Sequence, residues 1–364
     1  MKEMIYHGLT AAQYAMQACD TMMERYDAAD LPPKGHFHYH QGVFLSGVQR
    51  TYELTGKEKY YEYAKRWVDS LIGEDGVVKN FDPGQLDDIQ PGILLYQIYE
   101  RTGEERYHKA LSTLAGLVRD FPRNADGGFW HKEGNREQMW LDGLYMGGPI
   151  CTRYAAVFHQ PEFYDIAAFQ ALLMEKKTKD PVTGLWYHAW DSTRSARWAD
   201  PETGLSSQFW GRSIGWVPVA VLDELDDIPA QHEDRKELVR LVRELLTAVC
   251  AYQDSASGLW YQVTDKGGME GNWLESSCTC LFVAAICKAV RKGILDEKYM
   301  EHVVKGYRGI IDRLKYRDGQ VIIDNICVGT GVGDYAHYCS RPTSENDLHG
   351  VGAYLLMCTE AGSV

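Results

Sequence analysis

TGKEKYYEYA, residues 55–64, recurs along the chain in three altered copies. The copies are TGEERYHKAL (102–111), HQPEFYDIAA (159–168) and ILDEKYMEHV (294–303). Each places Glu and then Tyr two residues later, at the front of an amphipathic helical pattern. In three of the four, this Glu follows a glycine suited to end a helix, namely Gly56, Gly103 or Gly293. The repeat predicts that one helix ends and another begins at each of these points.

A second recurring element is a turn followed by a short aromatic strand, and it lies between the predicted helices. ADGGFWHKEG (125–134), VTGLWYHAWD (182–191) and ASGLWYQVTD (256–265) share it, and EDGVVKNF (74–81) and RDGQVIID (317–324) are degenerate copies. Asp-Gly and Thr-Gly turns before alternating aromatic residues are typical of short strands or hairpin arms and not of helices.

Two kinds of predicted helix alternate along the chain. Helices with one polar face, which belong on the outside, are expected at 8–26, 57–73, 104–120, 161–177, 233–253 and 296–315. Helices rich in Gly, Ala, Ser and aliphatic residues, which can be enclosed on all sides, are expected at 41–55, 87–102, 142–158, 208–227, 273–292 and 347–361. This alternation predicts an all-α fold, an (α/α)6 barrel of six inner and six outer helices, and the unbroken period predicts one domain over residues 1–364.

Loop lengths indicate which end of the barrel is functional. The links from inner to outer helices are only a few residues long, whereas those from outer to inner helices are mostly long and carry the aromatic strands. Short loops are structural by default and long ones tend to be functional. We therefore expect the pocket, with its short β-strands, at the end where the inner helices begin.

Composition narrows the possible partners. The formal net charge of −13 disfavours nucleic acid and anionic membranes as partners. The chain has no apolar run of signal-peptide or membrane-spanning length, and its nine irregularly spaced cysteines suggest reduced thiols, so we expect a cytoplasmic protein. Its 10 Trp and 23 Tyr hint at carbohydrate or another ring-stacking ligand. No obligate protein partner is evident.

The predicted pocket end gathers carboxylates, aromatic rings and cations. The acid candidates are Asp87 and Asp88 in QLDDIQPG and Asp142 in QMWLDGLYMGG. Other candidates from the inner-helix starts and long loops are the histidines of HYHQG, Trp130, His131, Trp186, His188, Trp190, Trp210, Arg212, Trp216, Trp273 and Glu275. Arg212 could belong to a structural ion pair or bind an anion, and both roles stay open.

Helix capping is the alternative explanation for the aspartates. Asp87, Asp88, Asp142 and Asp347 all lie where an N-cap is wanted, and a helix N-terminus lowers the pKa of a carboxyl group. A raised pKa at Asp142, as a general acid needs, would therefore require enclosure by aromatic rings and a second negative charge nearby. Asp88 is the candidate for that charge.

Metal binding is a weaker alternative. His36, His38 and His40 alternate as they would on one side of a strand, but neighbouring helices offer no obvious fourth ligand. Cys278 and Cys280 form a C-x-C pair without a second pair. We expect polar lining of the pocket in the first case and no zinc site in the second.

Nine segments resemble glycoside hydrolase family 105, the unsaturated rhamnogalacturonyl hydrolases, and more distantly the unsaturated glucuronyl hydrolases of family 88. The segments are HYHQGVF, LDDIQPG, GGFWHK, MWLDGLYMGGP, GLWYHAWD, FWGRSIGW, GLWYQVTDKG, NWLESS and NDLHG. The resemblance implies the same (α/α)6 barrel and an oligosaccharide substrate. It also implies action on the 4,5-unsaturated uronic acid that polysaccharide lyases leave at a non-reducing end, here expected to be galacturonyl linked to rhamnose.

The resemblance further implies a hydration reaction. Asp142 would protonate C4 of the enol ether and then accept a proton from the water that adds to C5, which requires a pKa raised toward neutrality. Asp88 would interact with sugar hydroxyls and with Asp142. The resemblance implies no metal and no organic cofactor. The substrate contacts carried over or placed at the pocket are Tyr39, His40, Trp130, His131, Trp140, His188, Arg212 and Trp216.

The sequence leaves two alternative functions open. An inverting glycosidase on the same barrel would use Asp88 as base and Asp142 as acid, with the spacing of the two carboxyl groups setting the outcome. A non-catalytic sugar-binding barrel would use the aromatic pocket without turnover.

Overall fold

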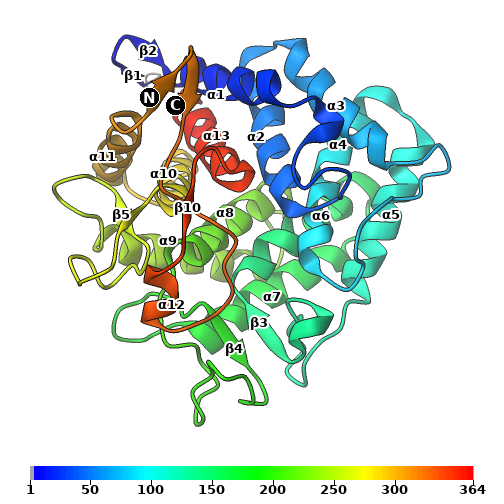
Figure 1. Cartoon of the computed structure of the whole chain (residues 1–364). Helices are drawn as coiled ribbons and strands as arrows, with labels where there is room; N and C mark the ends of the chain where they lie inside the picture. The colour runs from blue at the N-terminus through cyan, green and yellow to red at the C-terminus, as the bar shows by residue number, and fades with distance from the viewer. Residues whose placement is uncertain (1–3, 364) are drawn as a thin grey trace.

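The computed structural model describes residues 4–363, and its helices form two concentric sets (Figure 1). The inner set is α2 (Tyr39–Thr55), α4 (Leu94–Thr102), α6 (Asp142–Phe158), α8 (Gly211–Asp227), α10 (Ser276–Arg291) and α13 (Leu348–Gly362). The outer set is α1 (Ala11–Arg25), α3 (Glu58–Leu71), α5 (Glu105–Arg119), α7 (Glu162–Thr178), α9 (Arg235–Cys250) and α11 (Met300–Ile311). The inner elements pack on their neighbours in a closed ring, and α13 meets α2. The predicted barrel is confirmed.

Left-handed residues end several inner helices at the predicted points. Gly56 ends α2 and Gly103 ends α4, each with φ of +66° and its N–H bonded to the carbonyl four residues earlier. Gly293, with φ of +70°, follows α10. At the end of α6, His159 adopts this conformation instead, at φ of +58°. Each hairpin therefore closes with a short link to its outer helix.

The second inner helix starts later than the predicted residue 87. Residues Leu86–Asp88 (η2) and Gln90–Ile93 (η3) form 3₁₀ turns, and α4 begins only at Leu94. Pro91 explains the shift, because it has no N–H to donate and disfavours α conformation in the residue before it. Asp88 consequently lies on a tight turn and not on a helix.

Five two-stranded antiparallel ladders join the long loops. They are β1 (Ile5–Tyr6) with β2 (Leu9–Thr10), β3 (Gln138–Trp140) with β4 (Ala189–Asp191), β5 (Trp260–Tyr261) with β6 (Leu274–Glu275), β7 (Lys315–Arg317) with β8 (Gln320–Ile322), and β9 (Ile326–Cys327) with β10 (Thr343–Ser344). The aromatic copies at 182–191, 256–265 and 317–324 supply strands. The copy at 125–134 forms only isolated bridges.

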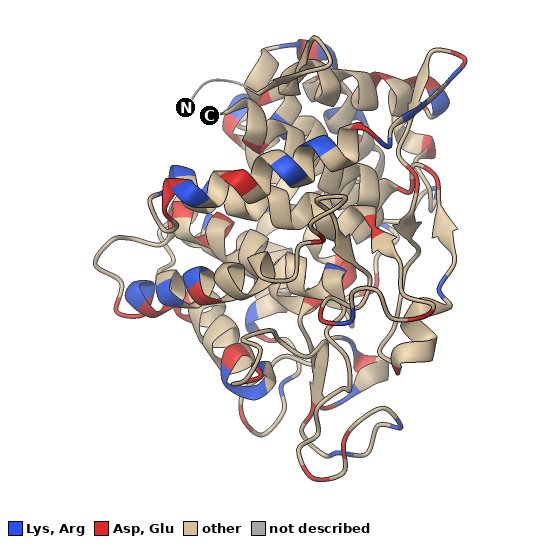
Figure 2. Cartoon of the chain, turned by 90° about the vertical axis from the view of Figure 1, so that its left-hand side faces the viewer, with Lys and Arg blue, Asp and Glu red and all other residues tan. Residues whose placement is uncertain are grey.

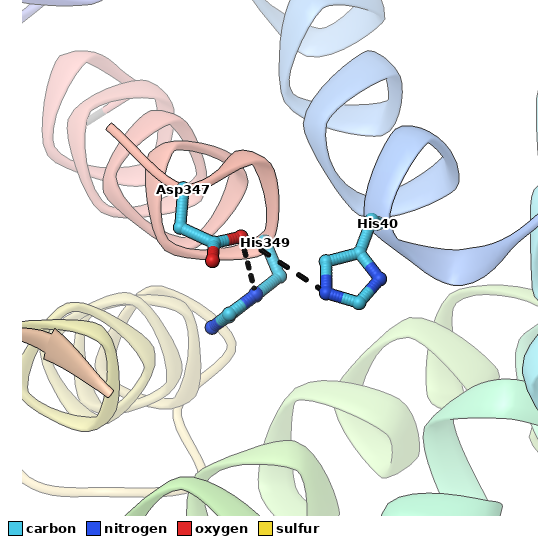
Figure 3. Close-up of side chains that lie close together, drawn as sticks. All are labelled: His40, Asp347 and His349. Carbon is cyan, nitrogen blue, oxygen red and sulfur yellow. Dashed lines mark ion pairs between the residues drawn. The ribbon is translucent and has the colours of Figure 1, made fainter. Parts of the chain in front are cut away.

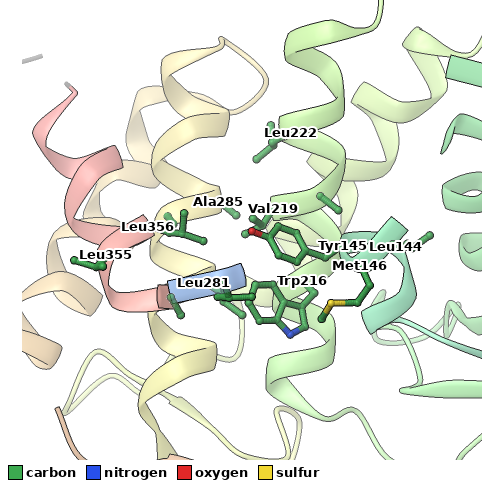
Figure 4. Close-up of a cluster of buried hydrophobic side chains, with 14 of the residues drawn as sticks. Leu144, Tyr145, Met146, Trp216, Val219, Leu222, Leu281, Ala285, Leu355 and Leu356 are labelled. Atoms are coloured by element: carbon green, nitrogen blue, oxygen red, sulfur yellow. The ribbon is translucent and has the colours of Figure 1, made fainter. Parts of the chain in front are cut away.

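Side chains of the inner helices fill the middle of the barrel. Figure 4 shows residues of α6, α8, α10 and α13 converging, among them Tyr145, Trp216, Leu281 and Leu355. Charged residues of both signs lie along the outward-facing helices (Figure 2). Within residues 4–363, none of the helices combines the length and apolar character that a bilayer-spanning segment requires.

Candidate active site

Asp142 is the first residue of α6, directly after strand β3. Leu141 and not Asp142 occupies the N-cap position of α6, so the capping explanation is wrong for this residue. Instead, Oδ2 lies 3.1 Å from Nε2 of His188. The carboxylate is 14% exposed. Asp142 is thus a nearly enclosed acid with one histidine partner.

His188 is held from both ring nitrogens. It is fully buried just before β4, and its Nδ1 lies 2.7 Å from the hydroxyl of Tyr338 in the short helix α12 (Tyr335–Cys339). Burial lowers the pKa of His188, so its imidazole is neutral at pH 7. Because an ionised Asp142 can only accept, Nε2–H donates to it and Tyr338 donates to Nδ1. Tyr338 therefore selects the tautomer that faces Asp142.

The pKa of Asp142 lies below its usual value, which corrects the expected rise. Burial raises this pKa, but the hydrogen bond from His188 and the neighbouring His131 and Arg212 outweigh it. The expected rise depended on negative charge from Asp88, whereas the nearest groups around Asp142 donate hydrogen bonds or carry positive charge. In the free protein Asp142 is a carboxylate.

Asp88 is buried on the turn η2, which packs against α6. It is not an N-cap either, since Gln85 occupies that position of η2. One of its oxygens pairs with Nδ1 of His38, and the other accepts the backbone N–H of Asp82 at 2.7 Å. Both carboxylate oxygens are therefore already engaged within the protein.

Trp140 and His131 form an aromatic wall beside the acid. Their rings stack at 4.4 Å between centroids and 9° between planes, and Trp140 meets His188 edge-on at 5.5 Å. His131 Nε2 also lies 3.7 Å from Asp87. Three of the predicted contact residues are thus brought together around Asp142.

Arg212 provides positive charge without a direct ion pair. It is 2% exposed, donates to the carbonyls of Cys327 and Val328, and lies over the ring of Trp210. Within residues 4–363, no carboxylate lies within ion-pair distance of its guanidinium. The structural ion-pair alternative is therefore wrong, and the charge stays available to an anion at short range.

The other predicted site residues lie at different depths. Trp216 is 1% exposed and stacks on Tyr145 at 4.5 Å, in the core below the site (Figure 4). Trp130 is half-buried, with Arg136 over its ring at 5.9 Å. Tyr39 and His40 begin α2 at the barrel mouth.

The strand of three histidines does not form. Because α2 already begins at Tyr39, the alternation breaks: His36 is exposed, His38 pairs with Asp88, and His40 turns toward Asp347. Glu275 is structural, since it accepts the N–H of Cys278 and caps α10.

Three comparisons bear on the family. The family model "Glycosyl Hydrolase Family 88" matches residues 14–363. A solved glycoside hydrolase of family 105 from C. acetobutylicum shares 34% identity, with 96% of this chain and 99% of that chain covered and a TM-score of 0.92. The unsaturated rhamnogalacturonyl hydrolase YesR of Bacillus subtilis is 28% identical, over 80% of this chain and 79% of its own.

One further solved structure extends the likeness of fold. The unsaturated glucuronyl hydrolase of Bacillus sp. GL1 has a TM-score of 0.72 at 17% identity, with 96% of this chain and 95% of that chain covered. The predicted resemblance to families 105 and 88 is confirmed by these matches.

Proposed function

Because the chain belongs to Glycosyl Hydrolase Family 88 and is a glycosidase, we propose that it removes a 4,5-unsaturated galacturonic acid linked to rhamnose by hydrating the C4=C5 bond. The observation that carries this proposal is the asymmetry of the two carboxylates. Asp142 has one histidine partner, whereas both oxygens of Asp88 are engaged by His38 and the Asp82 N–H. A single free carboxylate suits a reaction in which one residue acts first as acid and then as base.

The proposed reaction starts with a proton on Asp142. That proton adds to C4, and positive charge develops at C5, shared with the ring oxygen. Water then adds to C5 and gives a proton back to the Asp142 carboxylate. The resulting hemiketal opens to a ketone at C5, and the hemiacetal left at C1 releases the aglycone sugar. Asp142 ends in its protonated form, ready for another cycle.

We expect substrate binding to protonate Asp142, which is ionised in the free protein. The low pKa of Asp142 reflects the hydrogen bond from His188 and the positive charge of Arg212, which oppose the effect of burial. A uronate brings its own carboxylate and expels water, and both effects favour the neutral acid. We infer that Asp142 gains its proton when the anionic substrate enters the pocket.

The aromatic wall suits the same substrate. The stacked faces of Trp140 and His131 offer a flat surface beside the acid, onto which a half-planar unsaturated ring can pack. Arg212, without a carboxylate partner in the described chain, suits the uronate carboxylate or a neighbouring hydroxyl. The expectation of a cytoplasmic site of action stays a prediction.

Direct inverting hydrolysis is the rival function. It would need Asp88 to activate water while Asp142 protonates the leaving oxygen. Each Asp88 oxygen is already engaged by one group of the chain, which leaves one lone pair apiece and restricts where a water could be activated.

The test is a reaction in D₂O with the unsaturated disaccharide released by rhamnogalacturonan lyase, beside its saturated counterpart. We expect the ultraviolet absorption of the double bond to disappear together with rhamnose release, one deuterium at C4, and no cleavage of the saturated disaccharide. Cleavage of the saturated disaccharide at a similar rate would establish the rival. A panel of lyase products with other aglycones tests the assignment of rhamnose.

Asp142→Asn should reduce turnover by at least about 10³-fold, within the range general acid–base catalysis contributes. Substrate binding should persist, because the amide keeps the size of the side chain. The measurement is single-turnover loss of absorbance beside calorimetric binding. Asp165→Asn, on the exposed face of α7, is the matched control. Near-normal turnover in Asp142→Asn would remove Asp142 from the mechanism.

A further inference from the structure

Three side chains outside the Asp142 pair converge at the barrel mouth, namely His40, Asp347 and His349 (Figure 3). His40 comes from the start of α2, and the other two from the start of α13, which packs against α2. One nitrogen of each histidine and one oxygen of Asp347 all lie within 4.8 Å of one another. The first and last inner helices therefore bring two imidazoles and a carboxylate to one point.

Asp347 has no other structural role in the described chain. It occupies the N-cap position of α13, but its side chain caps no backbone N–H. Its ion-pair partners within residues 4–363 are the two histidines: Oδ1 lies 2.9 Å from Nδ1 of His349 and 4.0 Å from Nε2 of His40. No Lys or Arg of that region pairs with it. The capping explanation is therefore wrong for Asp347 as well.

His349 is oriented as a metal ligand would be. It is fully buried, and its Nε2 lies 3.0 Å from the carbonyl of Cys327, which can only accept. Nε2 therefore carries the proton. Nδ1 has no hydrogen-bond partner, although Oδ1 of Asp347 is 2.9 Å away. Two acceptor atoms at this distance repel each other unless a proton or a metal cation lies between them.

We propose that His40, Asp347 and His349 bind a divalent transition metal, with Zn²⁺ as the best match. Two imidazoles and one carboxylate are a ligand set that Zn²⁺ accepts, with a fourth position left for water. The His349 N–H bonded to a backbone carbonyl is the outer contact that orients a ligating histidine. A cavity of about 440 Å³, lined by His40, Asp347 and Glu345 among others, gives the ion a path from the surface.

A bound ion would join the two ends of the ring of inner helices. The ion would link the first inner helix of the chain to the last, at the junction where the barrel is completed. An ion that binds the folded chain and not the unfolded one stabilises the fold by mass action. His40 is also one of the expected substrate contacts, but the test of this metal site does not depend on turnover.

The experiment titrates Zn²⁺ into the full chain after treatment with a chelator, by calorimetry, and repeats the titration with Co²⁺ by visible absorption. We expect one ion per chain, and a melting temperature raised by about 4 °C at a hundredfold excess over Kd. His40→Gln and Asp347→Asn should each weaken binding by about 100-fold or more. His36→Gln, on the same segment but exposed, should bind as the parent chain does.

Circular dichroism establishes that each metal-free variant is folded before titration. Should a variant fail to fold, the Co²⁺ spectrum of the parent chain decides: bands of a low-symmetry site with imidazole ligands support the proposal, and the spectrum of the aqueous ion overturns it. Absence of saturable binding in the parent chain, or equal affinity in the His40, Asp347 and His36 variants, also overturns it.

Discussion

The two ends of the barrel treat buried carboxylates in opposite ways. Where the inner helices begin, Asp142 meets a neutral histidine, and Asp88 meets a histidine and a backbone N–H. Toward the other end, Asp223 pairs with both Arg50 and Lys288. This second end holds a cavity of about 300 Å³ whose lining includes Arg50, Lys288, Arg153, Asp226 and Asp227.

The difference shows that the partners of a buried carboxylate, and not its burial alone, decide whether it can exchange a proton. Burial raises the pKa of Asp223, but Arg50 and Lys288 reverse this and hold it at about 2. Such a carboxylate stays ionised at any physiological pH and cannot exchange a proton with a substrate. A neutral histidine constrains its partner far less, so the state of Asp142 can change when a charged ligand arrives.

After the loss of Asp142 itself, the largest effect on turnover is expected for Asp88→Asn. We expect turnover to fall by about 10²-fold, because the charge that pairs with His38 is lost at the edge of the pocket. Steady-state rates on the unsaturated disaccharide measure it. Asp87→Asn is the matched comparison, since Oδ1 of Asp87 lies 3.7 Å from Nε2 of His131, a longer contact than that between Asp88 and His38. An equal loss in both variants would contradict a special role for Asp88.

At the opposite end, Lys288→Met should cost stability and not chemistry. Removing this ammonium leaves Asp223 and Asp226 with less compensation in a buried network, at a cost of about 3 kcal/mol of unfolding free energy. Denaturant titration measures the change, and kcat per folded molecule should be unaltered. Lys34→Met, at an exposed ion pair with Asp30, should change stability little. A loss of kcat in Lys288→Met would contradict the assignment of stability to this end and of catalysis to the other.

Glu224→Gln, at the end opposite the candidate active site, should change how the stability of the chain depends on pH. Burial raises the pKa of Glu224 well above its usual value, and the charge of Asp223 adds to this. The folded chain therefore holds a proton that the unfolded chain has lost above about pH 4.3, so parent stability falls as pH rises.

The Gln variant lacks this proton, and the stability difference should widen in its favour by about 1.4 kcal/mol per pH unit from pH 5 upward. Melting curves between pH 5 and 7 measure the trend. The control is Glu175→Gln. Burial raises the pKa of Glu175, but Arg240 and Lys179 lower it overall, so this variant should lose stability at neutral pH. A pH-independent difference for Glu224→Gln would contradict a protonated Glu224.

The smallest effect is expected for Tyr338→Phe. Loss of the hydroxyl frees Nδ1 of His188 and lets the other tautomer form, at a cost of about 1 kcal/mol, or a roughly fivefold fall in kcat/KM. Because Asp142 then loses its donor for part of the time, its pKa should rise, and the pH profile of kcat/KM should shift upward. Tyr335→Phe, a half-buried tyrosine of the same helix whose hydroxyl donates to the Glu270 carbonyl and not to His188, is the control. An unshifted pH profile would mean that Tyr338 contributes only packing and does not select the tautomer of His188.

Much of the fold was predictable because its repeat is local. Glycine can adopt the left-handed conformation that ends α2 and α4, and α6 begins at Asp142 and ends at Phe158 as predicted. The start of α4 was predicted wrongly, because the helical pattern in LLYQIYERT masked the effect of Pro91 upstream.

The site was predictable in position and less so in its electrostatics. Asp142, His188, His131 and Trp140 meet because they lie at successive hairpins of one repeat. Tyr338 was missed, since YAHYC lies in a long segment without periodicity. The pKa of Asp142 was predicted with the wrong sign, because it is a small difference between burial and several cationic or hydrogen-bonding neighbours that are distant in sequence.

The ladder between β3 and β4 fixes the positions of Asp142 and His188 relative to each other. Trp140 pairs with Ala189, and Leu141 donates its N–H to the carbonyl of His188 at 3.0 Å. A slip of one residue in this register would turn Trp140 and His188 to the wrong faces together. Insertions before Gln138 or after Asp191 leave the register intact. The loops beyond the ladder are therefore the places where this barrel can be lengthened to meet a different aglycone.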